Sequence, residues 1–510
     1  MRTCLLAISF LLFSFSLLGQ KKDQIQILNA NELVYIDDPT IKAQRLIGDV
    51  RFKHHDALMF CDSAYFYSNK NKLTAFGHVQ IHQGDSMVIY GDRLDYDGNT
   101  GKAVVSGDIV RMVNEDFVLT TDELVFDRKK NTTSYHTGGK IVGKTDNNIL
   151  VSHTGYYFTK EKKFFFNKDV QLSNESYVMN TDSMTYQTSR KLVGFVGPTT
   201  IEGEGNFIYC EDGYYNTETE ISEYRKNAYL ISDGRKLEGN SLYYDRKIGF
   251  GRAVGNVQVT DTAEGLIING GRALLFEAKD SVIVTERSLL TQIFDQDSLY
   301  LHADTFKIVS DNNGGRLMKA YYGVRIFKTD LRGSCDSLVY SFSDSAIHMF
   351  ADPVLWSNQN QLTAKKIEIR SKDGHMHSIF MESDAYIISE VDPTKYNQIK
   401  GLQMTGFFKD NELSRIKVKG NGQTIYYAQD DLGKFIGVNK AEASDLQISI
   451  ESNQVRKILF QGSPNAVMYP INELGPDALR YEGFQWRIDQ MPTSKEDVFA
   501  KKQKLKKKKK

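Results

Sequence analysis

Cysteine and proline are scarce in this chain of 510 residues, which holds 4 cysteines and 8 prolines. Beyond the N-terminal apolar run only Cys61, Cys210 and Cys335 remain, and an odd, sparse set argues against a disulfide framework. With so few prolines, proline-rich linkers are not expected either. The fold must therefore be held together by its own core and by backbone hydrogen bonds.

Long apolar runs are also missing, with one exception at the N-terminus. Arg2 precedes an apolar run from Cys4 to Leu18, and the small-residue exit Gly19-Gln20 follows. This pattern predicts a secretory signal peptide over residues 1–20, with an uncleaved N-terminal anchor as the alternative. No later segment approaches 18 apolar residues, so we expect the rest of the chain to be soluble and exported.

Net charge is zero, from 64 basic and 64 acidic residues, but this balance is misleading. The last ten residues hold eight lysines, and without these and Arg2 the body has 55 basic against 64 acidic residues, about −9. A body this acidic is not typical of a nucleic-acid-binding protein, so no nucleic-acid partner is expected. The lysine-rich tail, residues 500–510, is interpreted as a solvated arm that contacts anionic phosphates or a membrane surface, with a merely disordered tail as the alternative.

Motifs that carry catalysis are not found. The chain has no phosphate-binding Walker motif, no Gly-x-Ser-x-Gly and no His-Glu-x-x-His, so we predict no enzyme, no catalytic residue and no cofactor. His54 and His55, together with His78 and His82, are the one set that suggests a metal. Because histidines at such strand spacings are mostly surface polar positions, we predict no metal site.

What the chain does have is an internal repeat. An Asp-Ser-apolar-x-aromatic piece appears at Asp62–Phe66, Asp182–Tyr186 and Asp336–Tyr340, among other copies. A Gly-x-apolar-x-apolar piece appears at Gly48–Phe52 and Gly77–Ile81, and both pieces recur about every 30 residues. Apolar alternation with period two and dense aromatic and β-branched residues predict an all-β fold, with no long helix.

The phase of the alternation changes just before each repeated Asp. Apolar residues lie on odd positions through Met87 and Ile89 and on even positions through Leu94 and Tyr96. A one-residue slip turns a strand over unless the chain bends or bulges there. We therefore predict a corner before each Asp, where two short strands meet with both apolar rows facing one interior. The stack would be an elongated β-taco, or open β-jelly-roll.

The Asp row itself is expected to cap turns, each Asp accepting a hydrogen bond from a backbone N–H of its own turn. Metal ligation by the row is the alternative, but the Gly-rich nonapeptides of calcium-binding β-rolls are missing.

The same phase selects the side chains that line the interior. An open two-sheet stack would expose this lining to acyl chains, which bury at roughly 25 cal/mol per Å². The alternative for each residue is that it only packs the two sheets together. The predicted lining residues are Val50, Phe52, Met59, Phe66, Val79, Ile81, Met87, Ile89, Leu94, Tyr96, Phe117, Leu119, Leu124, Phe126, Met179 and Met184.

These repeats resemble the OstA-like N-terminal domain family, of the lipopolysaccharide transport protein A type. The resemblance rests on Leu46–Val50, Ala75–Ile81 and Gly91–Asp97, and is clearest over residues 30–260. It implies a periplasmic β-taco whose apolar groove holds lipid A acyl chains. It also implies end-on strand pairing with other β-taco transport components, and no catalytic residues.

These observations predict the organisation and function of the chain. Repeats are expected over residues 21–460, and a proline-containing segment with Trp486, residues 461–499, is expected to cap the sheet edge. The predicted function is an exported lipopolysaccharide-binding conduit or chaperone for outer-membrane assembly, located in the periplasm and associated with the outer membrane. An exported β-solenoid adhesin or scaffold is one alternative, and a polysaccharide-active enzyme is another.

Overall fold

The computed structural model describes most of the chain beyond the N-terminal run. The described residues are 24–37, 42–84, 87–145, 148–203, 205–232, 234–262, 265–294, 297–310, 315–372, 375–409, 412–430, 432–451, 454–471 and 473–500. The predicted signal peptide and residues 501–510 of the lysine-rich tail lie outside them. Within these ranges, no helix has the length and apolar character needed to cross a membrane.

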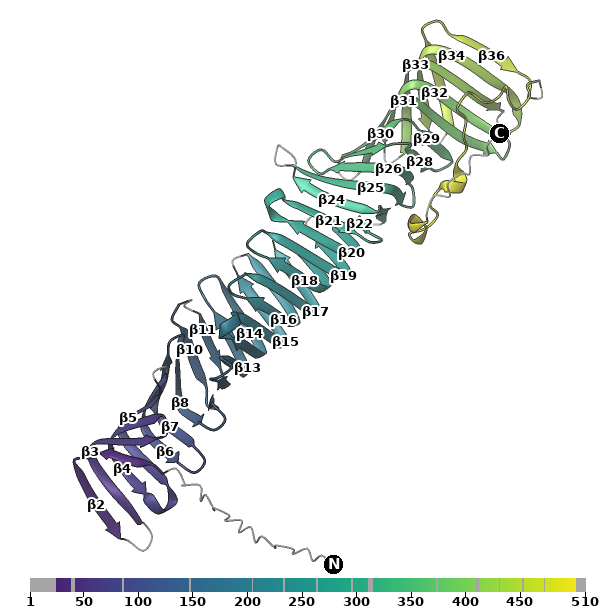
Figure 1. Cartoon of the computed structure of the whole chain (residues 1–510). Coiled ribbons are helices and arrows are strands. Elements are labelled where there is room, and N and C mark those ends of the chain that lie inside the picture. Colours follow the sequence, from purple (N-terminus) through teal and green to yellow (C-terminus); the bar gives the residue numbers. More distant parts are fainter. Residues whose placement is uncertain are drawn as a thin grey trace, which may run out of the picture. The chain divides into compact units, whose positions relative to one another are not determined.

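The chain divides into two compact units, Met1–Lys191 and Leu192–Lys510. The described part of unit 1 is built from strands and one 3-10 turn (Figure 1). Its elements are β1 (Gln26–Asn29), β2 (Glu32–Asp37), β3 (Lys42–His54), β4 (Ala57–Tyr67), η1 (Ser68–Lys70), β5 (Lys72–Gln83), β6 (Met87–Asp97), β7 (Lys102–Asn114), β8 (Phe117–Asp127), β9 (Thr132–Tyr135), β10 (Gly139–Gly143), β11 (Ile149–Ser152), β12 (Thr154–Phe158), β13 (Lys163–Ser173) and β14 (Tyr177–Gln187), with η2 (Thr188–Arg190) at its end.

Unit 2 continues the same construction with longer strands toward its end. Its elements are β15 (Leu192–Gly203), β16 (Asn206–Asn216), β17 (Ile221–Ser232), β18 (Arg235–Asp245), β19 (Phe250–Asp261), β20 (Leu266–Phe276), η3 (Glu277–Lys279), β21 (Ser281–Thr285), β22 (Leu289–Ile293), β23 (Ser298–His302), β24 (Thr305–Ser310), β25 (Arg316–Phe327), β26 (Arg332–Ser341), β27 (Ala346–Phe350), β28 (Val354–Ser357), β29 (Asn360–Thr363), β30 (Lys366–Lys372), β31 (His375–Asp392), β32 (Lys395–Lys409), β33 (Glu412–Gln429), β34 (Phe435–Glu451), β35 (Gln454–Gln461), β36 (Asn465–Tyr469), η4 (Ile488–Gln490) and η5 (Glu496–Phe499). No α-helix occurs among the described residues, and the predicted all-β fold is confirmed.

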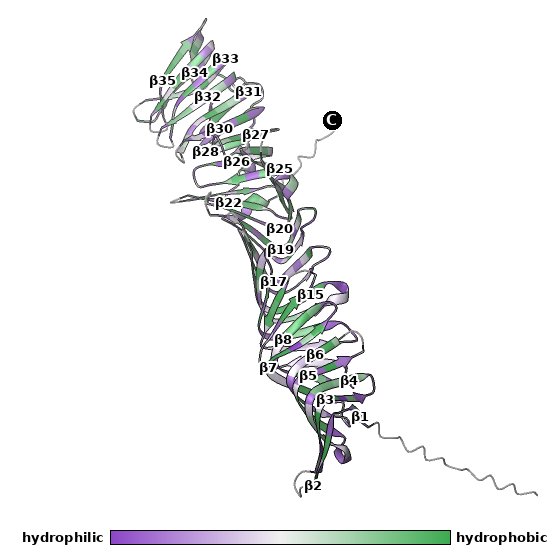
Figure 2. Ribbon diagram, turned by 90° about the vertical axis from the view of Figure 1, so that its left-hand side faces the viewer, coloured by the Kyte–Doolittle hydropathy of each residue, from purple (hydrophilic) through white to green (hydrophobic). Residues whose placement is uncertain are grey.

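Strands in each unit pair antiparallel with their neighbours in the chain. In unit 1, β3 pairs with β4, β4 with β5, and so on to β8. Where a strand is split at the corner, its two halves pair separately: β11 and β12 both pair with β13. In Figure 2 the apolar stretches lie along the strands, and hydrophilic residues gather at the turns.

The corner is the repeated feature of both units. The β3–β4 ladder is interrupted between Ile47 and Val50, and the β4–β5 ladder between Phe60 and Ser63. On alternate strands the interruption holds a pair of left-handed residues, such as Gly48-Asp49 in unit 1 and Gly255-Asn256 in unit 2. Such pairs recur about every 30 residues through much of the chain, matching the period of the sequence repeat.

Burial along the strands changes phase at the corner, as predicted. In β4 the buried positions are odd as far as Cys61 and even from Ala64 to Phe66. In β8 they are odd as far as Thr121 and even from Leu124 to Phe126. Both halves of each strand therefore direct their apolar row toward one interior, and the β-taco fold is confirmed.

The partner of the corner Asp differs from the prediction. Asp92 Oδ2 accepts from the backbone N–H of Asp108, 3.1 Å away on the neighbouring strand. Asp62 Oδ2 lies 2.7 Å from His78 Nδ1, also one strand away. At these corners the Asp thus ties adjacent layers together instead of capping its own turn, because the bulge on the next strand places the N–H of Asp108 beside Asp92 and the imidazole of His78 beside Asp62.

The C-terminal segment turns back along unit 2. After β36, which pairs with β34, residues 473–500 form a strap that lies against earlier strands (Figure 1). Gln398 donates to the carbonyl oxygen of Leu479 at 2.8 Å and accepts from the N–H of Tyr481 at 3.1 Å. Leu479 and Tyr481 are buried in a cluster with strand residues that include Ile425 and Val438.

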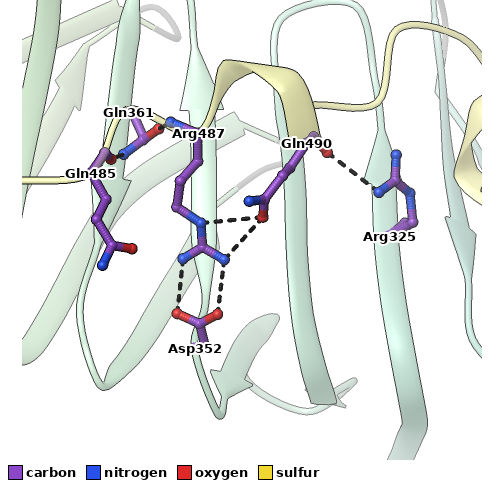
Figure 3. A network of polar contacts seen from close by, with 6 residues as sticks. All are labelled: Arg325, Asp352, Gln361, Gln485, Arg487 and Gln490. Atoms are coloured by element: carbon purple, nitrogen blue, oxygen red, sulfur yellow. Dashed lines mark hydrogen bonds and ion pairs between the residues drawn. The ribbon is translucent and has the colours of Figure 1, made fainter. Parts of the chain in front are cut away.

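Polar contacts hold the strap further along, as Figure 3 shows. Gln361, which is 1% exposed, donates to the carbonyl oxygen of Gln485 at 2.6 Å and accepts from the N–H of Arg487 at 2.7 Å. The Arg487 guanidinium forks onto both oxygens of Asp352, at 2.8 Å each. The strap therefore completes a second, outer packing layer on the face opposite the interior. Trp356 lies on this outer face, because it is directly opposite Gln361 in the β28–β29 ladder.

Substitution of the corner glycine should destabilise the fold by steric conflict. Gly77 has φ +74°, and a Cβ there would lie 2.3 Å from Asp62 Oδ2, whereas Gly84 (φ +57°) has no described atom within 4 Å of such a Cβ. We expect Gly84→Ala to cost about 1 kcal/mol from left-handed strain alone, and Gly77→Ala to cost clearly more. Urea unfolding of the full chain measures both, and Asp62→Ala should partly rescue Gly77→Ala. Equal losses for the two glycines would contradict this account of the corner.

Substitution of Gln361 should loosen the strap. Gln361→Ala leaves one N–H and one carbonyl of the strap without their partner, and each loss costs roughly 1–3 kcal/mol. Asp352→Ala removes an ion pair whose acid side chain is 68% exposed, and should cost less than about 1 kcal/mol. Trypsin cleavage after Arg480, Arg487 and Lys495, followed by mass spectrometry, should therefore be faster in Gln361→Ala. Equal cleavage rates in the two variants would count against the buried glutamine as the anchor.

Candidate functional site: the apolar interior

All of the predicted lining residues lie in the buried core. None of them is more than 7% exposed, and Val50, Phe52, Ile89, Leu94 and Leu124 are fully buried. They come from both halves of the strands, before and after the corner. The structure thus brings these side chains together in one interior. Their predicted contact with acyl chains remains a proposal, taken up below.

Side chains from the two halves meet across this interior. The rings of Phe52 and Phe66 lie 5.9 Å apart between centroids. Phe117 makes edge contacts with Tyr157 at 5.2 Å and with Phe164 at 4.8 Å. Since the core residues are almost inaccessible to solvent, the interior of the structure is filled by the protein's own side chains.

A hydrogen bond crosses the interior near the turns. His54, at the end of β3, lies 2.6 Å from the hydroxyl of Tyr96, near the end of β6, and only 1% of His54 is exposed. The expectation that the histidines are surface positions is therefore wrong for His54. It holds for His55 and His78, which are exposed. Polar side chains thus meet across the interior at the ends of these strands.

Burial affects the pKa of the thiol and hydroxyl groups in the core. It raises the pKa of the Cys61 and Cys210 thiols to about 12, and that of the Tyr135 hydroxyl to about 12. These groups are neutral at physiological pH, so they add no charge to the apolar lining. At the outer corner the hydrogen bond and negative charge of Asp62 raise the pKa of His78. Within the described ranges, no group of three His, Cys, Asp or Glu side chains could hold a metal ion.

Phase reasoning missed other buried aromatic residues of the same interior. Tyr157 and Phe164 stack at 4.3 Å between centroids, and Phe164 stacks on Phe166 at 5.2 Å. The aromatic residues are consecutive in the stretches TGYYF and KFFFN, so the sequence there has no alternation that selects the inward rings. Only the burial pattern of the strands shows that every second ring faces the interior.

Comparison with protein families agrees with this geometry. The family model described as OstA-like protein matches residues 22–182. The resemblance to the OstA-like family is thus confirmed over this part of the chain. The OstA-like region includes the strands β1 to β13 that carry most of the predicted lining residues.

Comparison with solved structures gives a partial match. One matching structure is that of LptH from Pseudomonas aeruginosa, the LptA-homologous periplasmic component of the conserved lipopolysaccharide transport device. It is 13% identical, and the match covers 28% of this chain and 95% of that chain, with a TM-score of 0.22. A comparison with curated proteins gives no match.

Proposed function

We propose that this chain is an exported lipopolysaccharide-binding conduit or chaperone that acts in the periplasm, associated with the outer membrane, in lipopolysaccharide transport. The observation that carries the proposal is the continuous row of buried apolar side chains inside an OstA-like stack of strands. The apolar run of residues 1–20, outside the described residues, would direct export.

Acyl chains would enter by replacing contacts between the two halves. The halves are joined along the corner, while their inner faces meet through side-chain contacts such as that of Phe117 with Tyr157. Burial of an acyl chain yields roughly 25 cal/mol per Å², but the side chains that separate lose comparable contacts. The net affinity at any one layer is then small, which suits a cargo that slides. Movement in one direction would require an energy source outside this chain.

Strand β2 offers an edge near the N-terminus for end-on pairing with another β-taco component. Leu33, Val34 and Tyr35 of β2 are 49%, 48% and 73% exposed, and β2 pairs with β3. An exposed apolar edge strand is a template for β-augmentation. We therefore propose that β2 receives a strand of a partner protein of the same fold. The lysine-rich tail would contact anionic phosphates at a membrane surface.

A scaffold or adhesin is the second candidate, and the filled interior favours it. If the two halves never separate, the buried lining is only a core, and the protein would carry no lipid. Extraction of lipid from the protein purified from its native envelope separates the two functions. Bound lipopolysaccharide supports the conduit, whereas lipid-free protein supports the scaffold.

Photo-crosslinking tests the lining directly. A crosslinking residue at Ile89, Leu119 or Met179 should capture lipopolysaccharide in cells, because these positions face the interior. The matched controls are Arg93 and Glu123, which are exposed on neighbouring positions and should give little product. Capture only at the two controls would refute the assignment of the interior as the lipid path.

The same chemistry tests the edge strand. A crosslinking residue at Val34 should capture a second β-taco protein or another copy of this chain, and mass spectrometry should place the product on a strand of that partner. Ile248, which is 67% exposed in a turn, is the control for random collision. Products of equal yield at both positions, or products outside β-strands, would contradict end-on pairing.

A further inference from the structure

One pocket in unit 2 is lined by an apolar wall and by a cluster of charged side chains. Its apolar wall includes Leu266, Ile268, Ile308 and Phe342. Arg235, Asp261 and Arg316 complete the lining. Most of the interior holds only apolar side chains, so this concentration of charge requires a separate explanation.

Two guanidinium groups converge on one carboxylate oxygen in this cluster. Arg235 Nε lies 3.1 Å from Asp261 Oδ2, and Arg316 Nη1 lies 3.6 Å from the same atom. The Asp261 side chain is 12% exposed, whereas those of Arg235 and Arg316 are 41% and 30% exposed. Asp261 is thus the most buried of the three side chains, and the two arginines retain donors that face solvent.

The cluster also departs from the repeat. Arg235 is the first residue of β18 and pairs directly with Asp261 at the end of β19. The corresponding first positions of β4, β6 and β8 are Ala57, Met87 and Phe117, all buried, and that of β16 is the exposed but uncharged Asn206. Among these strands only β18 carries a charge at this position, and this exception indicates a local function.

We propose that this pocket binds the phosphate group of an amphiphile, with the hydrocarbon chain against Leu266, Ile308 and Phe342. This inference rests on the proposed function. The arginine fork matches phosphate geometry, and two arginines balance the charge of a phosphate monoester better than that of a carboxylate. Asp261 serves as the resident anion that satisfies both arginines when the pocket is empty, and phosphate oxygens replace it on binding.

Calorimetric titration of the full chain with dodecyl phosphate tests the pocket. Arg316→Gln should weaken binding by about tenfold or more, because a charge-assisted contact is lost. Asp261→Asn should strengthen binding several-fold, because the competing carboxylate is removed. Arg272→Gln is the matched control, because Arg272 pairs with Glu286 at 3.4 Å and does not line the pocket. Its loss should leave the affinity for dodecyl phosphate unchanged. Circular dichroism checks that each variant is folded.

Two further ligands test whether binding requires both the phosphate group and the hydrocarbon chain. Dodecyl maltoside, which has the chain but no phosphate, and inorganic phosphate, which has no chain, should both bind much more weakly. If inorganic phosphate binds as tightly as dodecyl phosphate, the site does not recognise an amphiphile. If Arg316→Gln and Arg272→Gln have equal effects, or if Asp261→Asn binds more weakly, the charged cluster is not the phosphate site. If lipopolysaccharide still crosslinks at Ile89 while dodecyl phosphate does not bind, only this inference fails. If both fail, the proposed function fails.

Discussion

The change of phase at the corner is the constraint on which the rest of this structure depends. A straight strand with the same alternation would bury one half of its apolar row and expose the other. The bulge turns the second half over, so both rows face one interior. Left-handed residues such as Asp49 and His78 are unfavourable by roughly 1–2 kcal/mol each, and hydrogen bonds to the neighbouring layer offset part of this cost.

Features that depend on neighbouring residues could be predicted from the sequence. The phase around Asp92 is visible in Met87, Ile89, Leu94 and Tyr96 themselves, and all four of these are buried. The hydrogen-bond partner of Asp92 could not be predicted in the same way. It lies on the next strand, and its identity depends on the register of two bulges, which the alternation alone does not specify.

The strap and the charged pocket depend on contacts between distant parts of the chain. Gln361 and Arg487 are 126 positions apart, and no period connects them. One local signal was available in the sequence: Val354 to Trp356 and Ala385 to Ile388 are runs of consecutive apolar residues, and the structure buries all of them. Consecutive buried residues indicate a sheet covered on both faces. The sequence could thus have indicated an outer layer, although not which segment forms it.

A filled apolar interior and a charged pocket have different consequences for a sliding cargo. Layers with similar apolar contacts give similar free energies, so an acyl chain would have no preferred position among them. Two arginines would create such a position, and without a competitor they could hold a phosphate strongly enough to stop movement. Asp261 limits this effect, because each phosphate must displace a carboxylate already bound to both arginines. The proposed site would therefore slow the movement of the cargo without stopping it.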